Sequence, residues 1–217
     1  MDTQNIFWQK YGKLLSTIAE HHSMLSLRWI EFCSRHNINL FNQRQRKVYQ
    51  IPEDSTLSEA IIEYQNFLVS EIASTNIAEQ LEMLGASSSR IKGRNSIENK
   101  IDRYIFVQDE HGHSPINKCL NDIWGIRVIT NEEYNLKEIQ NVIESKTFSE
   151  KLRAISSIKE AGAYKAIHVY FSHGNNTFDC ELQIWYKKFV ESNELSHRRH
   201  KQQYTLWESV LKEDGNK

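Results

Sequence analysis

The chain has few of the features that mark secreted, membrane-spanning or zinc-binding proteins. Among 217 residues there are two prolines and three cysteines, and the cysteines are far apart at positions 33, 119 and 180. This spacing fits neither a disulfide framework nor a cysteine metal site, and it favours a reducing compartment. No apolar run approaches the roughly 20 residues that a membrane-spanning helix needs. The segment 1–12 has no basic stretch followed by an apolar one, so the sequence predicts a cytoplasmic protein without a signal peptide.

An excess of either charge is also lacking. Lys and Arg total 27 and Asp and Glu total 28, which leaves a net charge of -1. Such a chain has no overall attraction to nucleic acid or to anionic lipid, so we expect neither DNA nor a membrane as a partner. Any phosphate binding must therefore come from local clusters of charge. Apolar residues make up 39% of the chain, which is enough for a folded core.

Hydrophobic periodicity predicts three parts of the chain. Residues 1–85 have helical spacing, with Ser55 as the expected cap of one helix and a short helix over 78–84 that stops at Gly85. From residue 86, the pattern predicts strands over 123–130, 165–171 and 177–186 and a helix over 134–143. We therefore expect an α+β fold with a mixed, largely antiparallel sheet flanked by helices. The expected parts are a helical N-terminal extension (1–85), a core (86–201) and a C-terminal tail (202–217).

A first cluster of polar residues lies in the segment 90–103. If a helix begins just after Gly93, several cations and a hydroxyl gather near its N-terminus. They are Arg90, Lys92, Ser96, Lys100 and Arg103. A polyphosphate favours this environment, because helix N–H groups and fixed cations both attract negative charge. Taken alone, the segment is more typical of a solvated basic helix face.

A second cluster begins with Asp122, at the start of the hydrophobic run 123–130. Mg²⁺ prefers oxygen ligands and is usually held by one or two carboxylates together with substrate phosphates, so Asp122 is a candidate ligand. Strict alternation along a strand would put Asp122 and Arg127 on opposite faces, unless Gly125 marks a bulge. The plain alternative for Asp122 is a residue that caps a turn.

A third cluster lies on two alternating runs that predict a hairpin. Tyr164 and His168 share the polar face of the first run, and Glu181 and Gln183 share that of the second. A two-residue turn at 174–175 would place His168 opposite Glu181. A sheet face with these side chains is typical of a binding or catalytic site, although a solvent-facing side of a hairpin is also normal.

Taken together and in order, these clusters resemble the motifs of the RelA/SpoT-type alarmone synthetases. The resemblance covers roughly residues 86–201. The Arg-x-Lys, Ser and Lys of the family's first motif are matched by Arg90, Lys92, Ser96 and Lys100. The Asp-Ile-x-Gly-x-Arg motif is matched by 122–127, and the Glu-x-Gln-Ile motif by 181–184. The Gly-Tyr-Arg-Ser-x-His motif is similar to 163–168.

The resemblance implies a RelA/SpoT-like nucleotidyltransferase fold and a Mg²⁺-dependent pyrophosphokinase. In that reaction the 3′-hydroxyl of GDP or GTP attacks the β-phosphate of ATP, which yields ppGpp or pppGpp and releases AMP. By the same resemblance, Asp122 and Glu181 hold Mg²⁺, and Glu181 also takes the proton of the hydroxyl. The implied ATP ligands are Arg90, Lys92, Ser96, Lys100 and Arg127. The implied acceptor ligands are Tyr164, which would stack on the base, and Lys165, His168 and Gln183.

The sequence departs from the family pattern mainly around the acceptor. Ala163 replaces the glycine before the tyrosine, Lys165-Ala166 replaces Arg-Ser, and Trp185-Tyr186 replaces Arg-Thr. These changes leave open the toxic branch of the family, which places pyrophosphate on the 3′ end of tRNA and has an antitoxin or other regulator as partner. A late basic group would then contact the tRNA backbone, unless it is only a solvated helix face. It consists of Lys187, Lys188, Arg198, Arg199 and Lys201.

A more distant alternative is a non-catalytic nucleotide-binding module. Loss of the metal carboxylates would indicate it. Asp122 and Glu181 are both present, which favours an enzyme.

Overall fold

The computed structural model describes residues 3–131, 136–145, 154–161 and 164–198. The helices are α1 (Thr3–His36), the 3₁₀ helix η1 (Val48–Gln50), α2 (Ser55–Ala73), α3 (Ile77–Met83), α4 (Arg94–Phe106), α5 (Ile116–Cys119) and α6 (Leu136–Glu144). The strands are β1 (Ser88–Ile91), β2 (Trp124–Thr130), β3 (Ala154–Ala161), β4 (Tyr164–Phe171) and β5 (Cys180–Tyr186). A 3₁₀ helix, η2 (Lys187–Phe189), leads into the helical residues 190–198.

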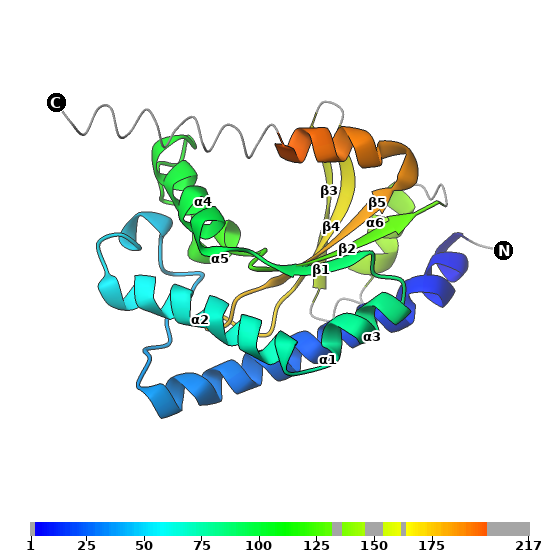
Figure 1. Ribbon diagram of the computed structural model, residues 1–217. Helices are drawn as coiled ribbons and strands as arrows, with labels where there is room; N and C mark the ends of the chain where they lie inside the picture. Colours follow the sequence, from blue (N-terminus) through cyan, green and yellow to red (C-terminus); the bar gives the residue numbers. More distant parts are fainter. Residues whose placement is uncertain (1–2, 132–135, 146–153, 162–163, 199–217) are drawn as a thin grey trace.

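The five strands form one sheet in the order β1-β2-β5-β4-β3 (Figure 1). β2 and β5 are parallel, and the other neighbouring strands are antiparallel. The prediction of a mixed, largely antiparallel sheet flanked by helices is therefore confirmed. β5 is the last of the described strands in sequence order but lies in the centre of the sheet, between β2 and β4.

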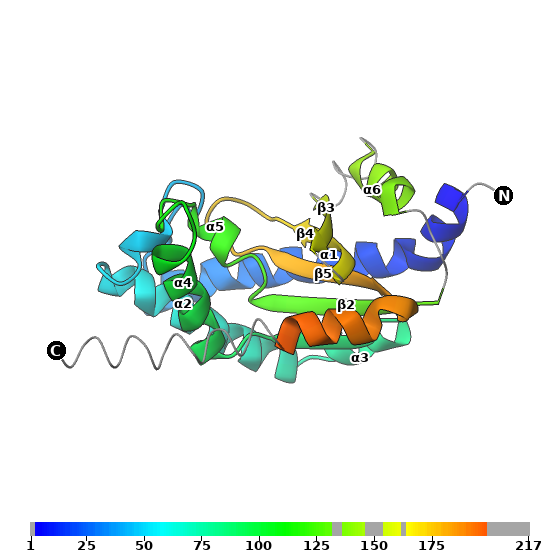
Figure 2. The same ribbon diagram turned by 90° about the horizontal axis from the view of Figure 1, so that it is seen from above.

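The two faces of the sheet differ in what covers them. Figures 1 and 2 show α1 and α3 along one face and the helical residues 190–198 over the other. The apolar face contributes Ile126, Val169 and Leu182 to a core that also contains Leu14 of α1 and Leu68 of α2. Burial of this apolar surface is the main force that holds the helices against the sheet. The opposite face is polar, and it carries the candidate site.

In the N-terminal helical part, local sequence signals predicted the start of α2 and the end of α3 to within one residue. Gly85 follows α3 with a φ of 99°, the left-handed conformation expected of a glycine after a helix. The expected cap of α2 is wrong by one residue, because the cap is Asp54 and Ser55 is the first helical residue. One Asp54 oxygen accepts hydrogen bonds from the backbone N–H groups of Thr56 and Leu57, at 3.1 and 3.2 Å. The Asp54 carboxylate thus accepts from the free N–H groups of the first turn and acts as the cap one residue before Ser55.

The sequence did not predict β1 and β3. Both are edge strands, where one side of the strand has no neighbour and the apolar alternation is weak. Ser88–Ile91 contains two serines, and Ile155 on β3 is 66% exposed. Within the described residues, no helix is both long and apolar enough to cross a membrane. The division of the chain at residues 85 and 201 stays a prediction, and the expected tail lies outside the described residues.

Candidate active site

The register of the sheet brings most of the predicted residues of β2, β4 and β5 onto one face. Arg127, Gln183 and His168 lie side by side in one row across the three strands. In the neighbouring row, Glu181 lies between Gly125 and Tyr170. Although this face is polar, its central strand is not open to solvent, since Glu181 is 5% exposed and Gln183 is 7% exposed. The solvated-hairpin alternative does not describe these two residues.

The predicted hairpin register is wrong by two residues. His168 pairs with Gln183, and Tyr170 pairs with Glu181. In place of a two-residue turn, residues 172–179 form a longer loop. Hydrogen bonds to distant parts of the chain hold this loop in place. The backbone N–H of Gln43 donates to the carbonyl of Asn175 at 2.8 Å, and His22 Nε2 lies 2.8 Å from the carbonyl of Phe178. A shift of two residues keeps each side chain on its predicted face.

Glu181 is held by hydrogen bonds to both carboxylate oxygens. Nδ1 of His168 lies 2.6 Å from Oε1, and Nε2 of Gln183 donates to Oε2 at 2.7 Å. The hydroxyl of Tyr164 lies 2.8 Å from Nε2 of the same histidine. Burial favours a raised pKa for Glu181, but the hydrogen bond and charge of His168 outweigh it and hold the pKa below its usual range. The carboxylate is therefore ionised and fixed in orientation.

Asp122 lies between two ammonium groups. Nζ of Lys92 is 2.5 Å from one of its oxygens, and Nζ of Lys100 is 2.9 Å from the other. Burial opposes ionisation of Asp122, but the charges of Lys100 and Lys92 outweigh it and hold the pKa of this carboxyl well below its usual range. Burial and the neighbouring charge of Lys100 lower the pKa of Lys92. The three side chains carry a net charge of about +1, which attracts an anion.

Gly125 is not a bulge. It pairs regularly with Arg90 on one side and with Glu181 on the other. Asp122 precedes β2, so strand alternation does not constrain its side chain. Residues 121 and 122 form a turn just before the strand, and the Asp122 side chain contacts Lys92 and Lys100 from there.

The first cluster has the helix that the sequence predicts. α4 begins at Arg94 with Gly93 as its N-cap residue, and Ile97 and Ile101 bury its apolar side. Ser96 lies exposed in the first turn of α4, one turn before Lys100. This arrangement brings a helix N-terminus close to the Lys92–Lys100–Asp122 cluster, which is the environment that favours phosphate.

A small pocket of about 230 Å³ lies next to this face. It is lined by Arg90, Arg127, Trp185, Glu194, His197 and Arg198. The guanidinium of Arg127 lies over the Trp185 ring, 3.5 Å from its centroid, and Nη2 donates to Oε1 of Gln183 at 3.3 Å. His197 stacks on Trp185 at 5.3 Å with an interplanar angle of 22°. Burial, followed by the charges of Arg127 and Arg90, lowers the pKa of His197 to about 4, so its ring is neutral at pH 7.

Three residues of this pocket, Trp185, Glu194 and His197, were not assigned from the sequence. Trp185 follows Glu181 and Gln183 at alternate positions, so alternation along β5 was a sufficient signal that it shares their face. His197 comes from the helical residues 190–198, and no local pattern indicates that this segment lies over the sheet. Asn193 holds the segment there, because its side-chain amide exchanges two hydrogen bonds of 2.9 Å with the backbone of Lys165.

Some predicted residues do not join the site. The side chain of Lys165 alternates to the other face from Tyr164 and His168, and its Nζ lies 3.6 Å from a carboxylate oxygen of Glu160. Lys187 and Lys188 are exposed at the start of the last helical segment, whereas Arg198, exposed at its end, lines the small pocket. The predicted Arg199 and Lys201 lie outside the described residues, as does Ala163.

The two carboxylates fit a magnesium ion that is shared with a substrate. Asp122 precedes β2 and Glu181 is near the start of β5, and because these strands are parallel both residues lie at the same end of the sheet. The described residues contain no group of three or more His, Cys, Asp or Glu side chains that could hold a metal. A site with one or two carboxylates suits Mg²⁺ when substrate phosphates provide further oxygens.

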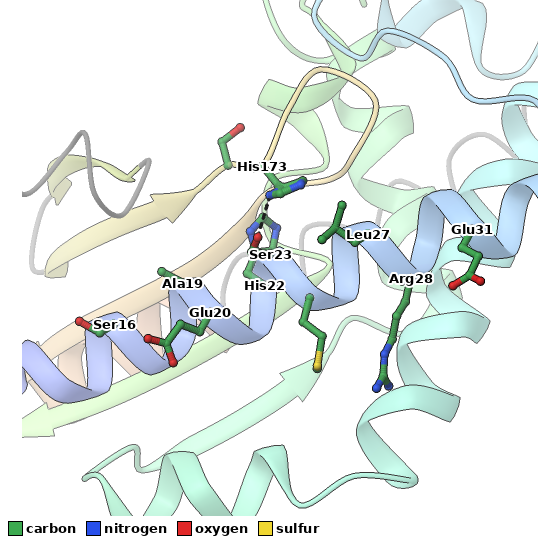
Figure 3. A pocket seen from close by; sticks show the side chains of 11 residues that line it. Ser16, Ala19, Glu20, His22, Ser23, Leu27, Arg28, Glu31 and His173 are labelled. Atoms are coloured by element: carbon green, nitrogen blue, oxygen red, sulfur yellow. Dashed lines mark hydrogen bonds between the residues drawn. The ribbon is translucent and has the colours of Figure 1, made fainter.

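A larger groove, of about 690 Å³, runs along α1 beside the loop between β4 and β5 (Figure 3). Its lining includes Ser23, Arg28 and His173. Ser23 Oγ lies 3.0 Å from Nδ1 of His173, and Arg28 is paired with Glu71 at 2.6 Å. The groove shares no lining residue with the carboxylate clusters, so the candidate site is on the polar face of the sheet.

Comparison with the models of protein families identifies the family of this chain. The model of a family described as "Region found in RelA / SpoT proteins" matches residues 89–208. The crystal structure of small alarmone synthetase 2 from Bacillus subtilis is similar at 16% identity and a TM-score of 0.38, over 68% of this chain and 82% of that chain. No curated protein gave a significant match. Since the family match spans more than half of the 217 residues and includes both carboxylates, the chain belongs to the RelA/SpoT family.

Proposed function

We propose that the protein transfers pyrophosphate from ATP to the 3′-hydroxyl of GDP or GTP. One observation carries the proposal: the ionised, buried Glu181 lies at the same end of the sheet as the Lys92–Lys100–Asp122 cluster. A base for a hydroxyl group and a cationic site for a polyphosphate are the two parts that such a transfer requires. Membership of the RelA/SpoT family supports the same reaction class.

The donor site is proposed around the N-terminus of α4. Lys92 and Lys100 would bind phosphate oxygens of ATP, with Ser96 in the first turn as a further hydrogen-bond donor. Arg90 and Arg127, which line the small pocket, would bind the remainder of the nucleotide. When bound, Mg²⁺ would be held by Asp122 and Glu181 and would neutralise charge on the phosphates. Phosphoryl-type transfer depends mainly on this positioning and neutralisation of charge.

The proposed chemical step is a displacement at the β-phosphorus of ATP. The acceptor 3′-oxygen forms a bond to this phosphorus, and the bond from the phosphorus to the oxygen that bridges the α- and β-phosphates breaks. AMP leaves with that oxygen, and Glu181 accepts the proton of the attacking hydroxyl. The lowered pKa of Glu181 keeps the carboxylate ionised and ready to accept a proton at neutral pH.

The acceptor site is proposed beside Tyr164, the first residue of β4. Tyr164 is partly buried there, and its ring makes an edge contact with Trp185 at 6.1 Å between centroids. An aromatic ring in this position suits stacking on a nucleobase, which tolerates different bases. His168 and Gln183 lie between this ring and Glu181.

An acceptor assay tests the proposal. The protein is incubated with Mg²⁺, γ-labelled ATP and GDP or GTP, and Glu181→Gln serves as the blank. Label in a guanosine nucleotide, together with release of AMP, supports the proposal. Absence of labelled product with every acceptor, from folded protein, contradicts it.

The 3′ end of tRNA is the second candidate acceptor and forms another arm of the same assay. The observation that favours this candidate is that the basic side chains of Lys187, Lys188 and Arg198 are exposed. Label in deacylated tRNA, with activity that falls steeply as salt is raised, would favour this acceptor over the nucleotide. Replacement of Lys187 and Lys188 by Gln would then weaken transfer to tRNA and leave the fold unchanged.

A further inference from the structure

A continuous chain of hydrogen bonds crosses three strands of the sheet and links the proposed donor and acceptor sites. Arg127 Nη2 donates to Gln183 Oε1 at 3.3 Å, and Gln183 Nε2 donates to Glu181 Oε2 at 2.7 Å. His168 continues the chain with Nδ1 at 2.6 Å from Glu181 Oε1 and Nε2 at 2.8 Å from the Tyr164 hydroxyl. Every link is between side chains on the polar face.

The chemistry of the carboxylate fixes the direction of the link to Glu181. An ionised carboxylate only accepts hydrogen bonds, so Nδ1 of His168 carries a proton and donates to Glu181. Nε2 of the same ring lies 2.8 Å from the Tyr164 hydroxyl, so one imidazole ring bonds both side chains. Burial, and then the charge of Glu181, raises the pKa of Tyr164 to about 12, so the phenol keeps its proton.

We propose that His168 is a positioning residue that joins the base Glu181 to the acceptor platform Tyr164, and does so with its two ring nitrogens. His168 is 9% exposed, which leaves little surface for direct contact with an acceptor. Through Nδ1 it sets the carboxylate orientation, together with Gln183 on the other oxygen. Through Nε2 it holds the hydroxyl of Tyr164, and so the plane on which a base would stack. This inference rests on the proposed function, because it assigns the parts of that site.

Two substitutions of His168 test the roles of its two ring nitrogens separately. In His168→Asn, the side-chain amide nitrogen lies near the position of Nδ1 and keeps a donor for Glu181, but nothing reaches Tyr164. In His168→Gln, the longer side chain reaches the position of Nε2 and keeps a partner for Tyr164, but Oε1 of Glu181 loses the donor that His168 provides. Tyr164→Phe keeps the stacking ring and removes only the hydroxyl.

The proposal predicts that some of these variants change mainly the acceptor KM and that another changes mainly kcat. His168→Asn and Tyr164→Phe should each raise the acceptor KM about fivefold, as for one lost neutral hydrogen bond, with kcat within about twofold. The double variant Tyr164→Phe/His168→Asn should be no worse than either single variant. His168→Gln should lower kcat about tenfold or more, since the lost bond is to a charged group, with the acceptor KM within about twofold. Equal effects of both His168 variants on kcat and KM, or additive effects in the double variant, would overturn the proposal.

A measurement that needs no turnover tests the same chain. Nitrogen-15 NMR of the His168 ring should show a proton on Nδ1, and Tyr164→Phe should shift the Nε2 signal. A proton on Nε2 alone would overturn the assignment. If the wild-type protein labels no acceptor, the proposed function fails, and the NMR result still decides whether His168 joins the two side chains.

Discussion

The guanidinium of Arg127 rests on the indole of Trp185, with Cζ 3.5 Å from the ring centroid. Trp185 is fully buried, and His197 also stacks against it. The aromatic ring and Gln183 together fix a cationic side chain that would otherwise be free to move. Trp185 occupies a position where the family pattern has an arginine, so the way in which this chain orients Arg127 is a departure from that pattern.

Trp185→Leu should weaken ATP binding about 5- to 30-fold, because a desolvated cation–π contact contributes about 1–2 kcal/mol. Trp185→Phe should lose less, because it keeps an aromatic face for Arg127. ATP titrations followed by calorimetry measure both effects. Unchanged ATP affinity in Trp185→Leu, in a variant that melts like the wild type, would exclude an orienting role for this ring.

Glu181→Gln should lower turnover at least about 100-fold, because the amide cannot accept the proton of the attacking hydroxyl. The amide has nearly the same shape as the carboxylate, so the melting temperature should change by only a few degrees. Label transfer and thermal melting measure the two quantities. Glu79→Gln, an exposed position on α3, is the matched control and should keep full activity. Normal turnover in Glu181→Gln would remove it from the role of base.

Tyr164→Ala should raise the KM for the acceptor about 10- to 100-fold and leave the KM for ATP nearly unchanged. Base–aromatic stacking contributes about 1–3 kcal/mol, and the alanine removes all of it. Initial rates at varied acceptor and fixed ATP give the first constant, and the reverse design gives the second. An acceptor KM equal to that of the wild type would show that Tyr164 is not part of the acceptor pocket.

Mg²⁺ and ATP should bind cooperatively. Asp122 is paired with Lys92 and Lys100, so a metal ion alone would have to separate these pairs, whereas ATP phosphates offer the lysines replacement partners. With an ATP analogue that has a methylene group between the α- and β-phosphates, both ligands together should raise the melting temperature by more than the sum of their separate effects, by at least about 3 °C.

The same melting experiment on Asp122→Asn provides the control for this cooperativity. The amide is a poor ligand for Mg²⁺, so the extra stabilisation should disappear. It also removes the charge that pairs with two partly buried ammonium groups, so the variant should be less stable by about 3 kcal/mol without ligands. If the effects of Mg²⁺ and the ATP analogue on the wild-type melting temperature were strictly additive, the predicted cooperative binding would be contradicted.

His22 should make the fold sensitive to acid. It is buried in α1, and burial is the main cause that lowers its pKa from 6.5 to about 4. The unfolded chain then takes up a proton more readily than the folded one between pH 6.5 and pH 4, so stability is full above pH 6.5 and falls as the pH drops through this window. The loss is on the order of 3 kcal/mol. His22→Gln should flatten the profile, as urea unfolding at pH 7 and pH 4.5 would measure; an unchanged slope would contradict this.

Local patterns predicted the parts of the site that depend on neighbouring residues in the sequence. The start of α4 after Gly93 follows from a local change of period, and the shared face of Glu181 and Gln183 follows from alternation. The register of β4 against β5 was wrong because its loop is held by Gln43 and His22, which are more than a hundred residues away.

Contacts between separate elements could not be read from local patterns. The pairing of Asp122 with Lys92 and Lys100 requires β1, α4 and β2 to be placed in space. The stack of His197 on Trp185 requires the packing of a helix over a sheet. Resemblance to a family supplied the expectation that these residues work together, while periodicity supplied only their individual faces.

The central place of β5 also affects how the protein folds during synthesis. β1 with β2 and β3 with β4 are antiparallel pairs that a growing chain can form early, but β5 joins them and is made last. Its parallel pairing with β2 links residues such as Arg127 and Gln183, which are 56 positions apart, and such distant contacts form slowly. Until then both pairs have an open edge, where strands from other chains can add. A chain arrested before residue 181 lacks the proposed base altogether, so activity is postponed until the sheet is closed.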